Sequence, residues 1–270
     1  MARQPVMYVP HGGGPWPWMS EGPFGGDAVW GTLRSYLRSV GREVREPRAI
    51  LCVTAHWEAP VPTVSSHPAP PMLFDYYGFP EHTYAVSYPA PGAPWLAARV
   101  RELLGAAGVP SAEDRERGLD HGTFVPLAVA WPRAEVPVVQ LSLVQGLVPD
   151  THLQVGRALA PLRDEGVLIL GSGMSYHDLR GLRSQSGARS AEAFDAWLRD
   201  VVQREEPSRN LALALWEEAP EARACHPREE HLLPLMVVAG AAGPDRGEVP
   251  FSDMILGARV SAVRFGGGVP

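Results

Sequence analysis

Five of the nine histidines lie where a side chain could do chemistry. They follow apolar runs, lie in glycine-flanked loops or stand at the start of an apolar segment: His11, His56, His121, His177 and His231. Neutral imidazole is a common ligand for divalent iron and zinc, and imidazole also transfers protons near neutral pH. Several histidines converging on one crevice would therefore predict a metal centre. The remaining four have weaker local context, and we expect them in loops or at the surface: His67, His82, His152 and His226.

The first of these histidines follows a short apolar run that begins at Val6 and is typical of a strand. Three glycines come directly after His11, and residues without side chains let a ligand approach the backbone. In open α/β sheets, ligands bind at the carboxyl ends of the strands. Taken alone, the segment is explained equally well by a turn with an incidental histidine.

Three further apolar runs are expected to form the rest of a buried sheet, at residues 48–55, 136–143 and 167–171. His56 directly follows the first of them, and His177 follows the last after a short loop. If these strands are parallel neighbours of the first strand, their histidines point into one crevice.

Helical periodicity alternates with these strands along the chain. Helices are predicted at residues 27–44, 95–108, 124–131, 149–165, 190–203, 210–217 and 229–242. The first turn of the last helix would carry Glu230 and His231. Residues 249–256 and 259–265 are expected to form an antiparallel pair at an edge. The pattern predicts one α/β domain over residues 1–270, with a mostly parallel or mixed central sheet flanked by helices and a metal site at the strand carboxyl ends.

Residues 66–94 form a long irregular passage that is rich in aromatic residues. Such loops in compact domains are usually functional or disordered, and the aromatic content argues against disorder. We interpret the passage as a wall or lid of a pocket for a flat or apolar molecule. Packing on the core would explain the same aromatic residues equally well.

Composition excludes several classes of function. The chain has a net charge of −6 and no lysine, which removes Schiff-base chemistry and a P-loop lysine. With an acidic balance and no dense arginine run, a nucleic-acid partner is not expected. No signal peptide or membrane span is predicted, and the two cysteines form no CxxC pair, so we expect a cytoplasmic protein without a membrane partner.

The chemical motifs that are missing narrow the choice further. No HExxH, GxSxG, GxGxxG or P-loop pattern occurs in the appropriate context. A mononuclear metal enzyme, with ligands drawn from distant segments, is therefore the interpretation that the residues favour.

Seven segments in order resemble a known family. They are His-Gly-Gly-Gly-Pro at 11–15, Thr-Ala-His-Trp at 54–57, Tyr-Gly-Phe-Pro at 77–80, Tyr-Pro-Ala-Pro-Gly at 88–92, Asp-His-Gly at 120–122, Ser-Gly-Met-Ser-Tyr-His at 172–177 and Glu-His-Leu-Leu-Pro-Leu at 230–235. The chain is similar, from about residue 6 to 265, to the class III extradiol ring-cleavage dioxygenases. It resembles the β-subunit of protocatechuate 4,5-dioxygenase and, more closely, the DOPA 4,5-dioxygenase group. Two positions depart from the pattern of that group. Where it usually has His-Gly-Ser-Pro, this chain has three glycines after His11, so the segment is one residue longer and lacks the serine; Asp178 stands where the group often has asparagine.

This resemblance implies a non-heme Fe(II) site, which Zn(II) can occupy in purified protein. His11 and His56 match metal ligands, and His231 matches the third, with Glu230 as the alternative carboxylate ligand. His177 has two interpretations, as a further metal ligand or as the catalytic acid and base. His121 would hydrogen-bond to the substrate or to bound oxygen.

The resemblance also implies the reaction, which is the extradiol cleavage of a catechol or aminophenol with O₂. Both oxygen atoms would be incorporated, and the product would be a ring-opened semialdehyde acid. Such reactions belong to the catabolism of aromatic compounds. The substrate pocket would involve the loop after His11 and the aromatic passage: Gly13, Tyr76, Tyr77, Phe79 and Tyr88. A zinc-dependent hydrolase on the same scaffold and a non-enzymatic metal-binding relative are the alternatives. Some members use a separate small subunit, and a homo-oligomer is compatible with the sequence.

Overall fold

The computed structural model describes residues 3–22, 25–44 and 47–266. An eight-stranded sheet runs through this part of the chain, in the order β4-β3-β5-β2-β6-β1-β8-β7. The strands are β1 (Val6–Pro10), β2 (Ala49–Ala59), β3 (Thr63–Ser65), β4 (Ala112–Asp114), β5 (Val138–Val144), β6 (Val167–Gly173), β7 (Gly247–Ile255) and β8 (Ala258–Phe265). The single α/β domain with a mixed sheet that the sequence predicts is confirmed.

The four central strands β5, β2, β6 and β1 are mutually parallel. At one edge β8 pairs antiparallel with β1, and β7 pairs antiparallel with β8, as expected for the terminal strands. At the other edge β3 pairs antiparallel with β5 and parallel with β4. β6 therefore lies between β1 and β2, and the carboxyl ends of all three strands meet at one end of the sheet.

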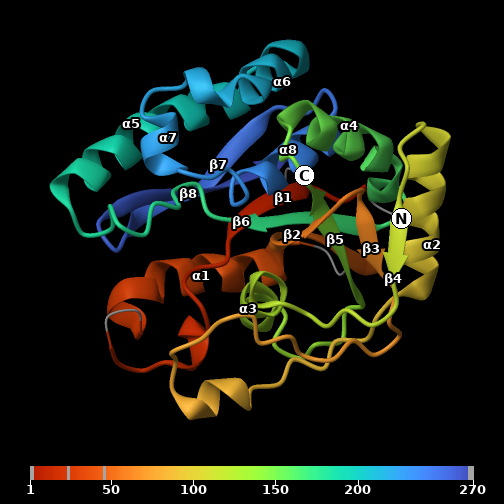
Figure 1. The fold of residues 1–270 in the computed structure, drawn as a ribbon, viewed down its shortest axis with the longest axis horizontal. Coiled ribbons are helices and arrows are strands. Elements are labelled where there is room, and N and C mark those ends of the chain that lie inside the picture. The colour runs from red at the N-terminus through yellow and green to blue at the C-terminus, as the bar shows by residue number, and fades with distance from the viewer. Residues whose placement is uncertain (1–2, 23–24, 45–46, 267–270) are drawn as a thin grey trace.

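Helices cover both faces of the sheet (Figure 1). The α-helices are α1 (Asp27–Glu43), α2 (Pro94–Ala106), α3 (His121–Ala130), α4 (Pro149–Leu159), α5 (Gln185–Val202), α6 (Glu206–Ala214), α7 (Ala222–Cys225) and α8 (Leu233–Ala242). Four short 3₁₀ turns occur as well, at Trp16–Trp18, Glu81–Tyr84, Ala160–Arg163 and Trp216–Glu218. α1 and α3 pack together on one side of the sheet, while α4 and α8 pack together on the other.

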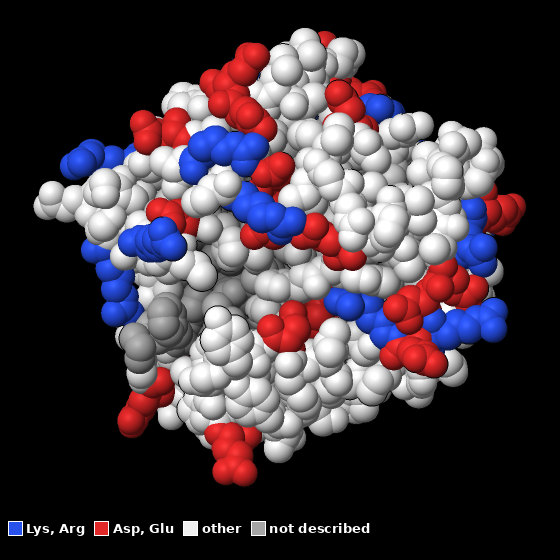
Figure 2. All heavy atoms as spheres, viewed as in Figure 1, with Lys and Arg blue, Asp and Glu red and all other residues white. Residues whose placement is uncertain are grey.

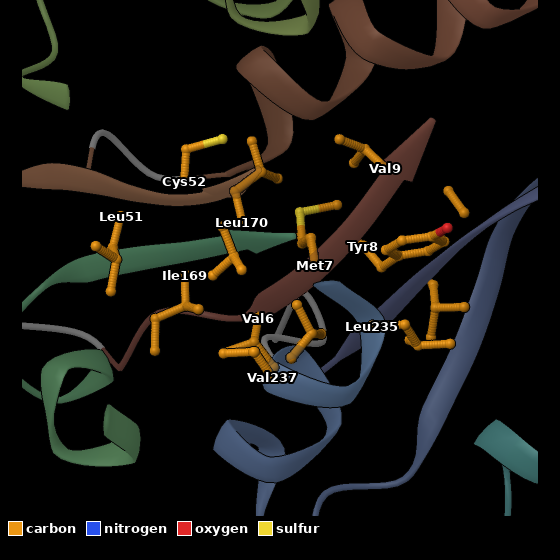
Figure 3. Packing of buried hydrophobic residues seen from close by; sticks show 14 of the residues in the cluster. Val6, Met7, Tyr8, Val9, Leu51, Cys52, Ile169, Leu170, Leu235 and Val237 are labelled. Carbon is orange, nitrogen blue, oxygen red and sulfur yellow. The ribbon is translucent and has the colours of Figure 1, made fainter. Parts of the chain in front are cut away.

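The apolar helix α8 is buried along its whole length against β1 and β6. Figure 3 shows Leu235 and Val237 of this helix beside Val6 and Tyr8 of β1. Glycines let α4 approach α8: a Cβ on Gly156 would lie 2.1 Å from the Val237 carbonyl oxygen. This close packing makes α8 a rigid support for the turn that precedes it.

Two expectations from the sequence are wrong. The last long helix begins at Leu233, not at residue 229, and Glu230 and His231 lie in the turn before it. Pro234, in the first turn of the helix, is the signal for that later start. His56 lies within β2, which continues to Ala59, and does not follow the strand.

The expectation of a loop or surface position is wrong for His152, which lies in α4, whereas His226 does lie in a loop but is not at the surface. His152 is 1% exposed, and its ring bonds to the backbone of Val144 and Val148. His226 is fully buried and bonds to the carbonyl oxygen of Ser175. The His226 bond joins segments that are distant in the sequence, which local context does not reveal, whereas the cited bonds of His152 are to residues four and eight positions earlier.

Acidic and basic groups are interspersed over the face of the molecule seen in Figure 2. Within the described residues, no helix is long and apolar enough to cross a membrane.

Candidate metal centre and active-site cavity

Three of the five selected histidines converge at the carboxyl end of the sheet. His11 directly follows β1, and its amide bonds to the Gly173 carbonyl at the end of β6, 3.1 Å away. His56 projects from β2 on the other side of β6. His231 is placed by the turn before α8. One nitrogen from each ring lies within 4.8 Å of the others.

The backbone around His231 is fixed by two bonds to its carbonyl oxygen. The buried Tyr8 hydroxyl donates to this oxygen at 2.7 Å, and the Met174 amide donates at 3.1 Å. A Cβ on Gly173 would lie 2.1 Å from the same oxygen, so glycine is required for this approach. β1 and β6 therefore position the His231 turn through its backbone.

The hydrogen bonds of these rings determine which nitrogens keep a lone pair. His11 Nδ1 lies 2.8 Å from the Gly12 carbonyl oxygen, and His231 Nδ1 lies 2.8 Å from Glu230 Oε1. Both oxygens can only accept here, so Nδ1 carries the proton and Nε2 carries the lone pair. Burial holds the pKa of His11 and of His231 well below the ordinary value, and burial together with the neighbouring His121 lowers the pKa of His56 to about 3. The three rings are therefore neutral.

His56 Nδ1 faces Asp75 Oδ2 at 3.5 Å, so the Nε2 of His56 also keeps a lone pair, and the three lone pairs face one another. His11 Nε2 and His56 Nε2 are 3.2 Å apart. His231 Nε2 is buried and has no hydrogen-bond partner among the described residues. Adjacent nitrogens bound to one metal at about 2.1 Å are about 3 Å apart. The residues present thus fit a divalent metal ion, with ring orientation set by a carbonyl and by carboxylates.

Two more histidines flank this centre, and each is anchored by a carboxylate. His121, the first residue of α3, donates from its amide nitrogen to Asp75 Oδ1 at 2.9 Å, and its Nδ1 lies 2.9 Å from the same oxygen. His177 Nδ1 lies 3.2 Å from Glu230 Oε1. The His177 ring also stacks on His231, with centroids 3.3 Å apart. No hydrogen bond to the second ring nitrogen of His121 or His177 is recorded within the described residues, so each can face a bound molecule.

The two carboxylates are shared between neighbouring rings. Asp75 Oδ2 lies 3.5 Å from His56 Nδ1, and Glu230 Oε1 accepts from His231 as well as from His177. Burial raises the pKa of both carboxyls, but hydrogen bonds and charges from the histidines outweigh it, so both pKa values are lowered. Both groups therefore stay ionised and can stabilise a protonated imidazole.

A cavity of about 580 Å³ opens over the histidines. All five selected histidines line it, together with the glycine loop, aromatic residues from the 66–94 passage and aliphatic residues near the β7–β8 hairpin. Its volume and largely apolar lining suit a small aromatic ligand.

Similarity to known proteins agrees with this geometry. The family described as the catalytic LigB subunit of aromatic ring-opening dioxygenase matches residues 5–256. The chain belongs to this family. Among its relatives, a dioxygenase named tasH from Hapsidospora irregularis is 36% identical over 99% of this chain and 87% of that protein. A 4,5-DOPA dioxygenase extradiol from Portulaca grandiflora is 45% identical over 73% of this chain and 74% of that protein.

A solved structure has the same fold. The crystal structure of an uncharacterized protein from Escherichia coli K12 has a TM-score of 0.78 and 28% sequence identity, covering 98% of this chain and all of that chain. Membership in the LigB family, together with these relatives, identifies an extradiol ring-cleavage dioxygenase, the enzyme class that the motifs predicted.

The LigB cavity includes most of the residues expected in the substrate pocket. Gly13, Tyr76, Tyr77 and Phe79 line it. Tyr88 does not: it is 2% exposed, and its hydroxyl donates to the Trp131 carbonyl oxygen at 3.2 Å, so it belongs to the core.

Sequence reasoning missed Asp75. It lies in the irregular passage, four residues before Phe79, and no periodic pattern marks it. The one available signal was a carboxylate within the passage that the sequence assigns to a pocket wall. Asp178, noted as a departure from the family pattern, also lines the cavity.

Proposed function

We propose that this LigB protein is an Fe(II)-dependent extradiol dioxygenase that cleaves the ring of a catechol or aminophenol with O₂. His11, His56 and His231 would hold the metal. The observation that carries this assignment is the convergence of their unprotonated Nε2 atoms, with His11 and His56 3.2 Å apart and His231 without a partner among the described residues.

The geometry favours His231 over Glu230 as the third ligand. Glu230 Oε1 already accepts from His231 and His177, so this carboxylate orients two rings. The remaining oxygen, Oε2, is buried and lies 3.5 Å from an Arg228 nitrogen. Carboxylates that accept from ligating histidines are a regular feature of metal sites.

Fe(II), when bound, supplies a Lewis acid and redox partner for the catechol and O₂. The chain's own residues would manage the protons and the water. His177, anchored by Glu230, would accept a proton from the catechol hydroxyl and return it later, acting as base and then as acid. His121, anchored by Asp75, would donate a hydrogen bond to the substrate. The aromatic wall at Tyr76 and Phe79 would pack against the ring and exclude water.

A decisive test loads the purified protein with Fe(II) without oxygen and then measures O₂ uptake with a panel of catechols and aminophenols. We expect O₂ consumption and a yellow ring-opened product. Zn(II)-loaded protein should consume no O₂, because zinc has no accessible redox change. Activity with zinc and none with iron would instead favour the metal-dependent hydrolase that the same three histidines could support.

Ligand assignment is tested by metal content. His11→Ala and His231→Ala should lose bound metal, whereas Glu230→Gln should retain it at reduced affinity. His82→Ala is the matched control, because His82 is exposed and does not line the cavity. Full metal content in His231→Ala together with loss in Glu230→Gln would make Glu230 the ligand.

A further inference from the structure

Away from the histidines, the cavity wall is aliphatic. Leu179 and Leu182 lie after β6, while Ile255, Leu256 and Val260 come from the β7–β8 hairpin. This part of the cavity would face the ring substituent of a catechol whose hydroxyls lie at the histidines. Apolar side chains alone would not distinguish substituents by charge.

Asp178 is the polar exception in this region. Within the described part of the chain, the charged side chains that line the cavity, histidines apart, are Asp75 and Asp178, and no arginine does. Asp75 is committed to His121 and His56. Among the described lining residues there is thus no arginine that could pair with a substrate carboxylate.

The Asp178 carboxylate is held in place but its charge is not paired. Oδ1 accepts from the Arg180 amide at 3.1 Å, which fixes the side chain over its own loop. Oδ2 lies over Gly181, where a Cβ would come within 2.6 Å of it. Among the described residues, the bond from the Arg180 amide is the hydrogen bond recorded for this carboxylate, and no ion pair is recorded for it. Asp178 is half-buried, so solvent screens its charge only in part.

We propose that Asp178 selects the charge of the substrate's substituent, and that the preferred substrates are catechols with a cationic, ammonium-bearing side chain. A carboxylate beside an aliphatic wall attracts a cation and repels an anion. The wall packs against the methylene groups that join the ring to the ammonium. This inference rests on the proposed ring-cleaving function.

The test uses three catechols of similar size that differ in charge: dopamine as cation, 4-propylcatechol as neutral analogue and 3,4-dihydroxyphenylacetate as anion. Steady-state O₂ uptake gives kcat and KM for each with the Fe(II)-loaded protein. Dissociation constants measured without oxygen give a second readout that is independent of turnover. The variant is Asp178→Asn, whose side-chain oxygen can still accept from the Arg180 amide. Asp253→Asn on β7 is the matched control, since it removes the same charge outside the cavity lining.

In the unmodified protein we expect kcat/KM to fall from the cation to the neutral analogue to the anion. Asp178→Asn should lower kcat/KM for dopamine about three- to tenfold, mostly through KM, as for a partly exposed ion pair. It should raise kcat/KM for the anion and leave the neutral analogue within about twofold. Dissociation constants should change in parallel, and Asp253→Asn should change none of these values.

Two outcomes would overturn the inference while leaving ring cleavage intact: preference for the anion in the unmodified protein, or equal effects of Asp178→Asn on all three catechols. Absence of O₂ uptake with every catechol would instead contradict the proposed function. The anaerobic dissociation constants would still show whether Asp178 discriminates charge.

Discussion

Asp75→Asn should weaken metal binding more than it slows turnover at saturating metal. Asp75 Oδ1 accepts two bonds from His121, both at 2.9 Å, whereas Oδ2 has one longer contact of 3.5 Å with His56 Nδ1. The single oxygen of asparagine should therefore stay with His121, and its NH₂ group should face His56.

A donor at that position changes the tautomer of His56. Facing an NH₂ group, Nδ1 becomes the acceptor and the proton moves to Nε2. Nε2 is the atom that lies 3.2 Å from His11 Nε2, so the variant removes one of the converging lone pairs. Loss of an orienting partner typically costs about 10- to 100-fold in metal affinity, or about 1.4–2.7 kcal/mol.

Fe(II) affinity is measured without oxygen by competition with a coloured chelator, and kcat is measured by O₂ uptake at saturating metal. Asp253→Asn is the control for loss of one negative charge. Unchanged affinity in Asp75→Asn would refute the tautomer argument. If the unchanged affinity were accompanied by a large loss of kcat, the NH₂ group of the asparagine would face His121 and not His56.

Three further outcomes follow from the packing around the centre. Tyr8→Phe removes the 2.7 Å bond to the His231 carbonyl and should lower the free energy of unfolding in urea by about 1 kcal/mol. Gly122→Ala places a Cβ 2.7 Å from His56 Cδ2, so it should cost about 1–3 kcal/mol and weaken Fe(II) binding. Burial lowers the pKa of His226 to about 3, so the unfolded chain takes up this proton first as pH falls below about 6.5. The metal-free protein should therefore lose about 2 kcal/mol from this group between pH 7 and 5, and His226→Gln should remove that part of the pH dependence in urea titrations.

Matched measurements separate these effects from general destabilisation. Gly105→Ala is the control for Gly122→Ala, because a Cβ at Gly105 meets nothing within 4 Å. Equal metal affinity in both alanine variants would contradict the steric argument. An unfolding free energy unchanged by Tyr8→Phe would show that the Met174 amide alone holds the turn. A pH dependence that survives in His226→Gln would assign it to other histidines.

The sequence predicts the strands that position His11, His56 and His177 because buried parallel strands are recognisable apolar runs. Strand order was not predictable from such runs, since each is compatible with several neighbours. That β6 lies between β1 and β2 is a consequence of tertiary packing. His11 and His56 therefore converge although their strands are not direct neighbours, because β6 lies parallel between them.

The irregular passage shows where prediction from sequence ends. Tyr76 and Tyr88 are both tyrosines of this passage, yet one lines the cavity and the other is buried against Trp131. No period relates positions in a passage without regular structure, so sequence spacing cannot assign their faces. Asp75 was missed for the same reason.

The glycine loop after His11 combines fixed and free positions. Gly12 has a φ of +81°, and a Cβ there would lie 2.3 Å from Trp16 Nε1, which donates to the His11 carbonyl. Gly14 has a φ of +53°, and a Cβ there would lie 2.6 Å from the Phe79 ring. Both positions therefore require glycine. A Cβ at Gly13 would make only a 3.4 Å contact with Trp30, and its φ is outside the left-handed region. Gly13 also lines the cavity. The loop conformation needs the other two glycines, whereas a side chain could be accommodated at Gly13. The absence of the serine usual in the family therefore has its chemical consequence at Gly13, where the cavity beside the metal centre is left open.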